Sequence, residues 1–177
     1  MAGSKLPDGE LAFMYFPDNY RWSHGMLGAL STAPWGGAEI DEVHRIGLRI
    51  KDHLGDDEVW FREWTGEAER LEAIGNEKAA AGHAHSASAY LLRAALYAQI
   101  GERFLHPKTE ASQAAYKRSV EVFRKAAGLM ARPRMEHVEV PYEGVTLPGI
   151  LVHGDPVPGR KGKAPVMLFL DGFDITK

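Results

Sequence analysis

Residues 87–105 read ASAYLLRAALYAQIGERFL, and this run decides the fold expected for the first part of the chain. Apolar side chains occur on nearly every side of a helix drawn through it, a pattern typical of a helix enclosed by neighbouring helices. We therefore expect a central helix over about residues 86–105, ended by Pro107. The residues on its most apolar side are Tyr90, Leu91, Ala94, Ala98 and Leu105.

Amphipathic segments lie on either side of this run in the sequence. Apolar residues recur at spacings of three and four over residues 38–54, from position 60 onward, and over 109–129. Asp56 or Asp57 suits the N-cap of the second segment, because a carboxylate accepts from the unpaired N–H groups there. A short helix is also expected over 24–30. The residues expected to face inward are Ile40, Val43, Ile46, Gly47, Ile50, Trp60, Trp64, Ala68, Leu71, Ala115, Val122, Phe123 and Ala126.

The pattern changes after Arg132-Pro133. The segment MEHVEVPYEGVTLPGILVHGD indicates two strands joined at Tyr142-Glu143-Gly144. Residues 164–170, APVMLFL, are apolar without alternation, which is typical of a strand covered on both faces in a parallel sheet. The sequence thus predicts an α/β protein with two domains. A helical domain of about four helices covers residues 1–130, and residues 134–177 begin a larger sheet that is incomplete in this chain.

Composition excludes several kinds of site. The 177 residues include 45% hydrophobic and 25% charged residues and carry a net charge of −3, so we expect neither disorder nor a nucleic-acid partner. The absence of cysteine excludes disulfides, thiolate metal sites and a cysteine nucleophile. Without a long apolar run, we expect a cytoplasmic protein with no membrane partner. His83 and His85 are expected in a solvated turn and not at a metal, and His137 and His153 at the surface.

The last residues suggest a ligand loop. Asp171-Gly172-Phe173-Asp174 follows the expected strand, and the carboxyl ends of strands in open α/β sheets are where ligands bind. Glycine allows the backbone to approach an anionic oxygen closely, so that an N–H group can donate to it. The alternative is an ordinary turn into a helix capped by Asp174 or Thr176.

Several motifs together resemble one group of α/β-hydrolases, which contains 2,6-dihydroxypseudooxynicotine hydrolase, the fungal polyketide-shortening hydrolases and the fermentation-respiration switch proteins. The similar segments are Pro141-Tyr142-Glu143-Gly144, Leu147-Pro148-Gly149, Gly172 to Lys177, Tyr20-Arg21-Trp22, Trp60 with Glu63-Trp64, and Ser88 to Ala94 with Tyr97. The resemblance implies an N-terminal helical cap and an oxyanion hole formed by backbone groups of Gly172 and Phe173. It also implies a glutamate immediately after Lys177.

The same resemblance implies a serine on a G-x-S-x-G elbow, followed by an acid and a histidine. The chain contains no G-x-S-x-G, so the triad is expected beyond Lys177, and this chain alone is expected to be inactive. The implied parent hydrolase cleaves an ester or a C–C bond beside a ketone and needs no cofactor. The alternative is a non-enzymatic helical interaction or dimerisation protein in which residues 1–130 form the working bundle.

Six residues of the helical part are candidates for a substrate pocket: Trp22, Trp60, Trp64, Tyr90, Arg93 and Tyr97. Aromatic rows at helical spacing usually form a core, whereas the functional interpretation has them cover an aromatic substrate between cap and hydrolase domain. Arg93 lies in a mostly apolar helix and needs a partner, either a buried carboxylate or a substrate anion. The expected partners are a small-molecule substrate, such as an aromatic ketone or ester, and a second copy in a homodimer.

Overall fold

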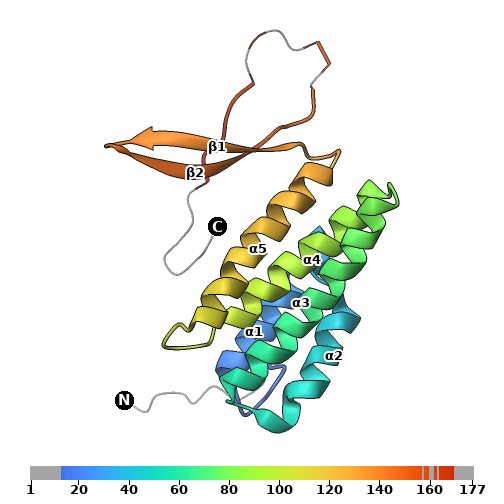
Figure 1. Ribbon diagram of the computed structural model, residues 1–177, viewed down its shortest axis with the longest axis vertical. Coiled ribbons are helices and arrows are strands. Elements are labelled where there is room, and N and C mark those ends of the chain that lie inside the picture. The colour runs from blue at the N-terminus through green and yellow to red at the C-terminus, as the bar shows by residue number, and fades with distance from the viewer. Residues whose placement is uncertain (1–12, 157, 160–161, 163, 170–177) are drawn as a thin grey trace, which may run out of the picture. The chain divides into compact units, whose positions relative to one another are not determined.

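The computed structural model describes residues 13–156, 158–159, 162 and 164–169, and the chain divides into two compact units between Leu129 and Met130 (Figure 1). The described part of the first unit contains α1 (Tyr20–Leu30), η1 (Ala33–Trp35), α2 (Ile40–Ile50), η2 (Lys51–His53), α3 (Asp57–Ala80), α4 (Ala84–Glu102) and α5 (Glu110–Leu129). The described part of the second contains β1 (Met135–Tyr142) and β2 (Val145–Val152). A search of the described residues finds no helix with the length and hydrophobicity that crossing a membrane requires.

Helix α4 is the centre of the helical unit, as its all-round apolar sequence predicts. It packs against α3 on one side and α5 on the other, and it also contacts α1 (Figure 1). Leu91 and Tyr97 are completely buried within it. The inward stripe expected on α3 is also confirmed, because Trp60, Trp64 and Leu71 have no exposed surface. The core is therefore built where three helices share the apolar surface of α4.

Side-chain caps mark the beginning of two of the helices, α3 and α1. The Asp56 carboxylate accepts from the backbone N–H groups of Glu58 and Val59 at 3.1 and 3.2 Å, so Asp56 is the N-cap of α3. Asn19 Oδ1 accepts from the N–H of Trp22 at 2.9 Å at the start of α1. Each cap satisfies N–H groups that have no partner within the helix.

Two features of the helical unit differ from the sequence prediction. The helix expected over 24–30 is confirmed, but α1 begins earlier, at Tyr20, because Asn19 caps it there. Ile40, expected to face inward, is instead 67% exposed. It is the first residue of α2, where the inward face begins only at Glu42 and Val43.

The second unit contains an antiparallel hairpin, as predicted. β1 and β2 pair in continuous register from Met135 opposite Val152 to Tyr142 opposite Val145. Glu143 and Gly144 connect them with φ angles of 45° and 80°. Positive φ at both central residues is the geometry of a type I′ turn, whose twist matches that of the strands.

The expected strand over 164–170 is not formed by the residues that the structure describes there. Residues 164–169 lie outside any helix or strand, and Leu170 lies outside the described residues. A strand forms only with a hydrogen-bonded neighbour, and in the described residues β1 and β2 pair only with each other. The apolar side chains Val166 to Phe169 are accordingly 75 to 82% exposed.

Two glycines of α3 provide a matched test of core packing. A Cβ added at Gly75 would lie 2.7 Å from Cγ of the buried Leu91, whereas one added at Gly66 would have no neighbour within 4 Å. Gly66→Ala should therefore stabilise the protein by up to about 1 kcal/mol through helix propensity. Gly75→Ala should instead destabilise it by about 1–3 kcal/mol through overpacking.

Urea unfolding of the two variants, followed by circular dichroism at 222 nm, measures both effects. Equal stabilisation by the two substitutions would contradict the close packing of α3 against α4.

Candidate functional site

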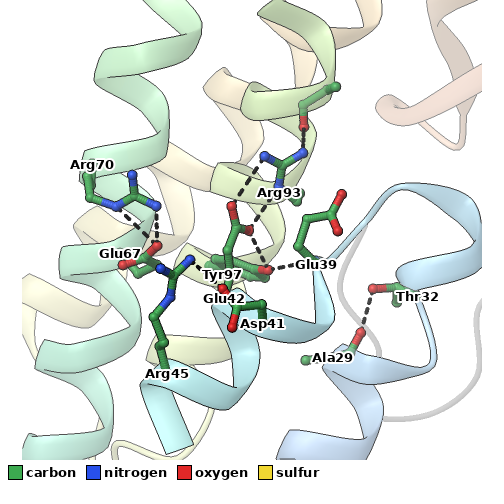
Figure 2. Close-up of polar contacts among 11 residues, drawn as sticks. Ala29, Thr32, Glu39, Asp41, Glu42, Arg45, Glu67, Arg70, Arg93 and Tyr97 are labelled. Atoms are coloured by element: carbon green, nitrogen blue, oxygen red, sulfur yellow. Dashed lines mark hydrogen bonds and ion pairs between the residues drawn. The ribbon is translucent and has the colours of Figure 1, made fainter. Parts of the chain in front are cut away.

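A buried ion pair joins α2 to α4 (Figure 2). Arg93 donates from Nε to Oε2 of Glu42 at 2.9 Å and from Nη2 to Oε1 at 3.3 Å. Both side chains are only 9% exposed. The expected carboxylate partner of Arg93 therefore exists. It is Glu42 of α2, which precedes Arg93 by 51 positions in the sequence.

Tyr97 completes this cluster. Its hydroxyl donates to Glu42 Oε2 at 2.9 Å and accepts from the backbone N–H of Glu39 at 3.1 Å (Figure 2). Arg93 donates further to the carbonyl of Ala89 at 3.2 Å. Arg93 and Tyr97 lie one turn apart on α4, so both reach the same carboxylate. Glu42, Arg93 and Tyr97, which we call the α2–α4 cluster, thus hold each other by hydrogen bonds within the protein.

Burial raises the pKa of the Tyr97 hydroxyl well above its ordinary value, and the adjacent Glu42 carboxylate acts in the same direction. The anionic form would lose hydration and would face the carboxylate that the neutral form contacts. Tyr97 is therefore a neutral donor in the folded protein. This protonation state suits a structural link or a hydrogen bond to an acceptor, and does not suit a general base.

Four of the six candidate pocket residues form a continuous row of rings. Trp22 and Trp60 have ring centroids 5.0 Å apart, Trp60 and Trp64 lie 5.4 Å apart, and Trp64 meets Tyr97 edge-on at 5.3 Å. None of the four has any exposed surface. The structure therefore brings these residues together, and in this arrangement the rings contact one another and the surrounding core.

Two of the three indole N–H groups of this row are held by hydrogen bonds. Trp22 Nε1 donates to Asp57 Oδ1 at 3.1 Å, and Trp60 Nε1 donates to the carbonyl of Ile100 at 2.9 Å. Trp64 Nε1 is buried without a hydrogen-bond partner among the described residues. Hydrogen bonds of this kind orient large rings within a core.

The remaining candidates differ in position. The guanidinium of Arg93, a member of the α2–α4 cluster, lies over the Tyr90 ring at 4.7 Å, and Tyr90 is partly buried beside the core. Gly172 and Phe173, the expected oxyanion-hole residues, lie outside the described residues. The role of all these residues in a site stays a prediction.

Sequence reasoning missed Glu42, on which the cluster depends. The signal was present, because Glu42 falls four positions before Ile46 on the face of α2 that also carries Val43. An acidic residue on an apolar helix face requires a buried cation or donor. Pairing this residue with Arg93 would have identified the contact.

On the hairpin, His153 Nε2 lies 3.3 Å from Glu136 Oε2, and Arg134 pairs with the same carboxylate. These neighbours lower the pKa of Glu136, and the adjacent His153 side chain is the largest cause. Among the described residues, no three His, Asp or Glu side chains are grouped so that they could hold a metal ion.

The chain is similar in sequence to known hydrolases of fungi. The chain is 38% identical over 154 residues to 20-hydroxy-prefusarin hydrolase FUS2 of Gibberella moniliformis, which covers 85% of this chain and 36% of that protein. It is 33% identical over 177 residues to hydrolase acrC of Aspergillus aculeatus, covering 93% of this chain and 41% of that protein. The chain corresponds to the N-terminal portion of an α/β-hydrolase.

A solved structure supports the same assignment. The crystal structure of 2,6-dihydroxy-pseudo-oxynicotine hydrolase matches 71% of this chain and 32% of its own, with a TM-score of 0.54 and 29% identity. No family model matches the chain. The chain spans about two fifths of the length of the curated relatives, so the α/β-hydrolase fold is represented here in part.

Breaking the buried ion pair should destabilise the helical unit far more than breaking an exposed ion pair. Glu42→Gln removes the charge opposite Arg93 and should cost about 3–5 kcal/mol, because the guanidinium is left buried without a counter-ion. The matched control is Asp41→Asn on the same helix. Asp41 pairs with Arg45 at 2.9 Å but is 76% exposed, so its loss should cost less than about 1 kcal/mol.

Guanidinium chloride unfolding of the two variants measures the difference. Replacing both partners with apolar residues, in the double variant Glu42→Leu and Arg93→Met, should recover most of the loss. Similar costs for Glu42→Gln and Asp41→Asn would show that the cluster does not carry the stability assigned to it.

The raised pKa of Tyr97 predicts a loss of stability at alkaline pH. Tyrosine in the unfolded chain ionises near its ordinary pKa of about 10, whereas folded Tyr97 keeps its proton to higher pH. The stabilisation is therefore complete below about pH 10 and declines as the pH rises above it, by up to about 1.4 kcal/mol per pH unit. Unfolding free energies of wild type and Tyr97→Phe between about pH 8 and 11 should show a shallower decline in the variant. Parallel curves would contradict this assignment.

Proposed function

We propose that this chain provides the helical cap and the opening of the catalytic domain of a serine-type α/β-hydrolase. The observation that carries the proposal is the identity of 33 and 38% to two fungal hydrolases over 93 and 85% of the chain. In this proposal residues 1–130 form the cap and residues 134–177 begin the hydrolase domain. The division into compact units after Leu129 supports it.

The proposed reaction needs a serine nucleophile and an oxyanion hole, and this chain would supply only the oxyanion hole. A serine outside this chain attacks a substrate carbonyl, and the backbone N–H groups of Gly172 and Phe173 stabilise the oxyanion that forms. The β1–β2 hairpin contains the Pro141–Gly144 and Leu147–Gly149 motifs and precedes the Gly172–Phe173 loop in the sequence. Because the chain contains no G-x-S-x-G, it supplies no elbow serine of its own.

The substrate in this proposal is a small carbonyl compound, either an ester or a molecule cleaved at a C–C bond next to a ketone. Two relatives carry in their names hydrolysis of 20-hydroxy-prefusarin and of 2,6-dihydroxy-pseudo-oxynicotine, both small molecules. Within this class we propose an aromatic ketone or ester; the aromatic row, which is completely buried in the helical unit, would support the pocket from behind and not contact the substrate. We place the parent enzyme in the cytoplasm, with no cofactor, nucleic-acid or membrane partner.

A chimera tests this proposal. Residues 1–177 replace the matched N-terminal part of FUS2, and the rest of FUS2 supplies the catalytic serine. The chimera should hydrolyse p-nitrophenyl esters and react with a fluorophosphonate, whereas residues 1–177 alone should do neither. Phe173→Pro in the chimera removes one backbone N–H donor and should lower kcat by about 10²–10³.

Phe173→Ala is the matched control, because it also removes the ring but keeps the N–H group, and it should retain most of kcat. Fluorophosphonate labelling of residues 1–177 alone would contradict the proposed missing nucleophile. Equal kcat in the Pro and Ala variants would show that the backbone N–H of Phe173 does not contribute to the oxyanion hole.

A further inference from the structure

Helices α1 and α2 are attached to the helical unit less extensively than the other three helices. α4 packs closely against both α3 and α5, whereas α1 makes a much smaller contact with α4 and α2 a much smaller one with α3 (Figure 1). Each of α1 and α2 has only 11 residues. Helices shorter than about 12–15 residues are marginally stable on their own in water, so α1 and α2 depend on their tertiary contacts to remain helical.

Two residues before α1 tie α1 to α2. The Phe16 N–H donates to Ser23 Oγ of α1 at 2.7 Å, and the same hydroxyl donates to the Phe16 carbonyl at 2.8 Å. The Tyr15 hydroxyl is hydrogen-bonded to His44 Nδ1 of α2 at 2.7 Å. Tyr15 lies this close to α2 because Gly47 has no side chain, and a Cβ there would be 2.3 Å from the tyrosine hydroxyl oxygen. These contacts join the two short helices into one body.

Ion pairs connect this body, which we call the α1–α2 layer and define as residues 15–50, to the other helices. Arg21 pairs with Asp57 of α3 at 2.7 Å, and Arg49 pairs with Glu63 of α3 at 2.8 Å. The α2–α4 cluster is a third connection and is buried. Among the described residues, no ion pair joins α4 to α3 or to α5. Ion pairs are therefore a feature of the boundary of the α1–α2 layer and not of the contacts between α4 and its two large neighbours.

This difference in chemistry makes the boundary of the layer easier to open. Val43, Ile46 and Ile50 are completely buried, so the layer is closed in the native state. When it opens, however, the separated ions regain hydration, which offsets much of the interaction that is lost. The α3–α4 contact is apolar instead, with Gly75 packed directly against the buried Leu91. Separating α3 from α4 would expose apolar surface without such compensation.

The connection between α2 and α3 allows the two parts to separate. η2 follows α2 directly, and Gly55 then adopts a φ of 95° immediately before the Asp56 N-cap of α3. The Asp56 carboxylate accepts from N–H groups of α3 itself, those of Glu58 and Val59. The start of α3 therefore keeps its cap without any contact from the α1–α2 layer.

We infer that the α1–α2 layer is a lid that opens and unfolds as one unit while α3, α4 and α5 stay folded, and that the ion pair of the α2–α4 cluster holds it closed. Local stability differs between parts of a protein, and the parts that open separately are those with few apolar contacts. Opening uncovers Arg93, Tyr97 and Trp60, whose contacts with Glu42 and Trp22 the closed layer provides. The inference rests on the helical unit alone and does not depend on the proposed hydrolase activity.

Hydrogen exchange of the 1–177 protein, followed by mass spectrometry of its peptides, tests the inference. The backbone amides of α1 and α2 should exchange together, at least about tenfold faster than the slowest amides of α4. Glu42→Gln should accelerate exchange in both α1 and α2 by at least about a hundredfold, because Arg93 loses its counter-ion in the closed state. The matched control is Asp41→Asn, which removes only the exposed pair with Arg45 and should change these rates by less than about fivefold.

Gly75→Ala distinguishes opening of the lid from unfolding of the whole helical unit. The substitution strains the α3–α4 contact, which is present with the lid closed or open. It should therefore accelerate exchange in α4 by about fivefold or more and leave the rates in α1 and α2 unchanged. Leu91→Val weakens the same contact through a cavity and provides the test if Gly75→Ala does not fold.

Three outcomes would overturn the inference. Equal exchange rates in α1, α2 and α4, or equal acceleration of all three by Gly75→Ala, would show that the unit unfolds as a whole. Acceleration by Glu42→Gln in α2 but not in α1 would show that the two helices open separately. Unchanged exchange in Glu42→Gln would show that the ion pair does not hold the lid closed.

Discussion

The burial of one guanidinium constrains the arrangement of the helical unit. Arg93 lies in the central helix α4, where most neighbours are apolar, and a charge in such surroundings requires a counter-ion. Glu42 provides it, which fixes α2 against α4 at one register. Tyr97 then occupies the second position on the same carboxylate oxygen and remains protonated. The ion pair thus specifies which face of α2 turns inward and which remains outside.

The aromatic row links three helices of the core. Trp22, Trp60 and Trp64 come from α1 and α3, and Tyr97 comes from α4, so the row links three helices through ring contacts. Their complete burial makes them structural in the described unit. Contacts between rings on three helices restrict how these helices can move relative to one another. This restriction is consistent with the proposed role without assigning a substrate contact to any ring.

The two units differ in how much of their apolar surface is buried. The helical unit encloses a continuous core around α4. The hairpin does not, because Tyr142, Val145 and Leu147 are about half exposed. A two-stranded sheet has too few neighbours to bury both faces. The chain spans about two fifths of the length of the hydrolase relatives that it matches.

Local sequence determined a large part of this protein. The all-round apolar pattern identified α4, spacing identified the inner faces of α2, α3 and α5, and the Glu143-Gly144 dipeptide located the hairpin turn, because these signals depend on neighbouring residues alone. Motif order also indicated the hydrolase group. Tertiary structure decided the rest. It chose Glu42 as the partner of Arg93 from 51 positions away and left Ile40 outside. It also left residues 164–169 unpaired. Each of these outcomes depends on which elements meet in space, because burial and hydrogen bonding between distant segments are properties of the assembled fold.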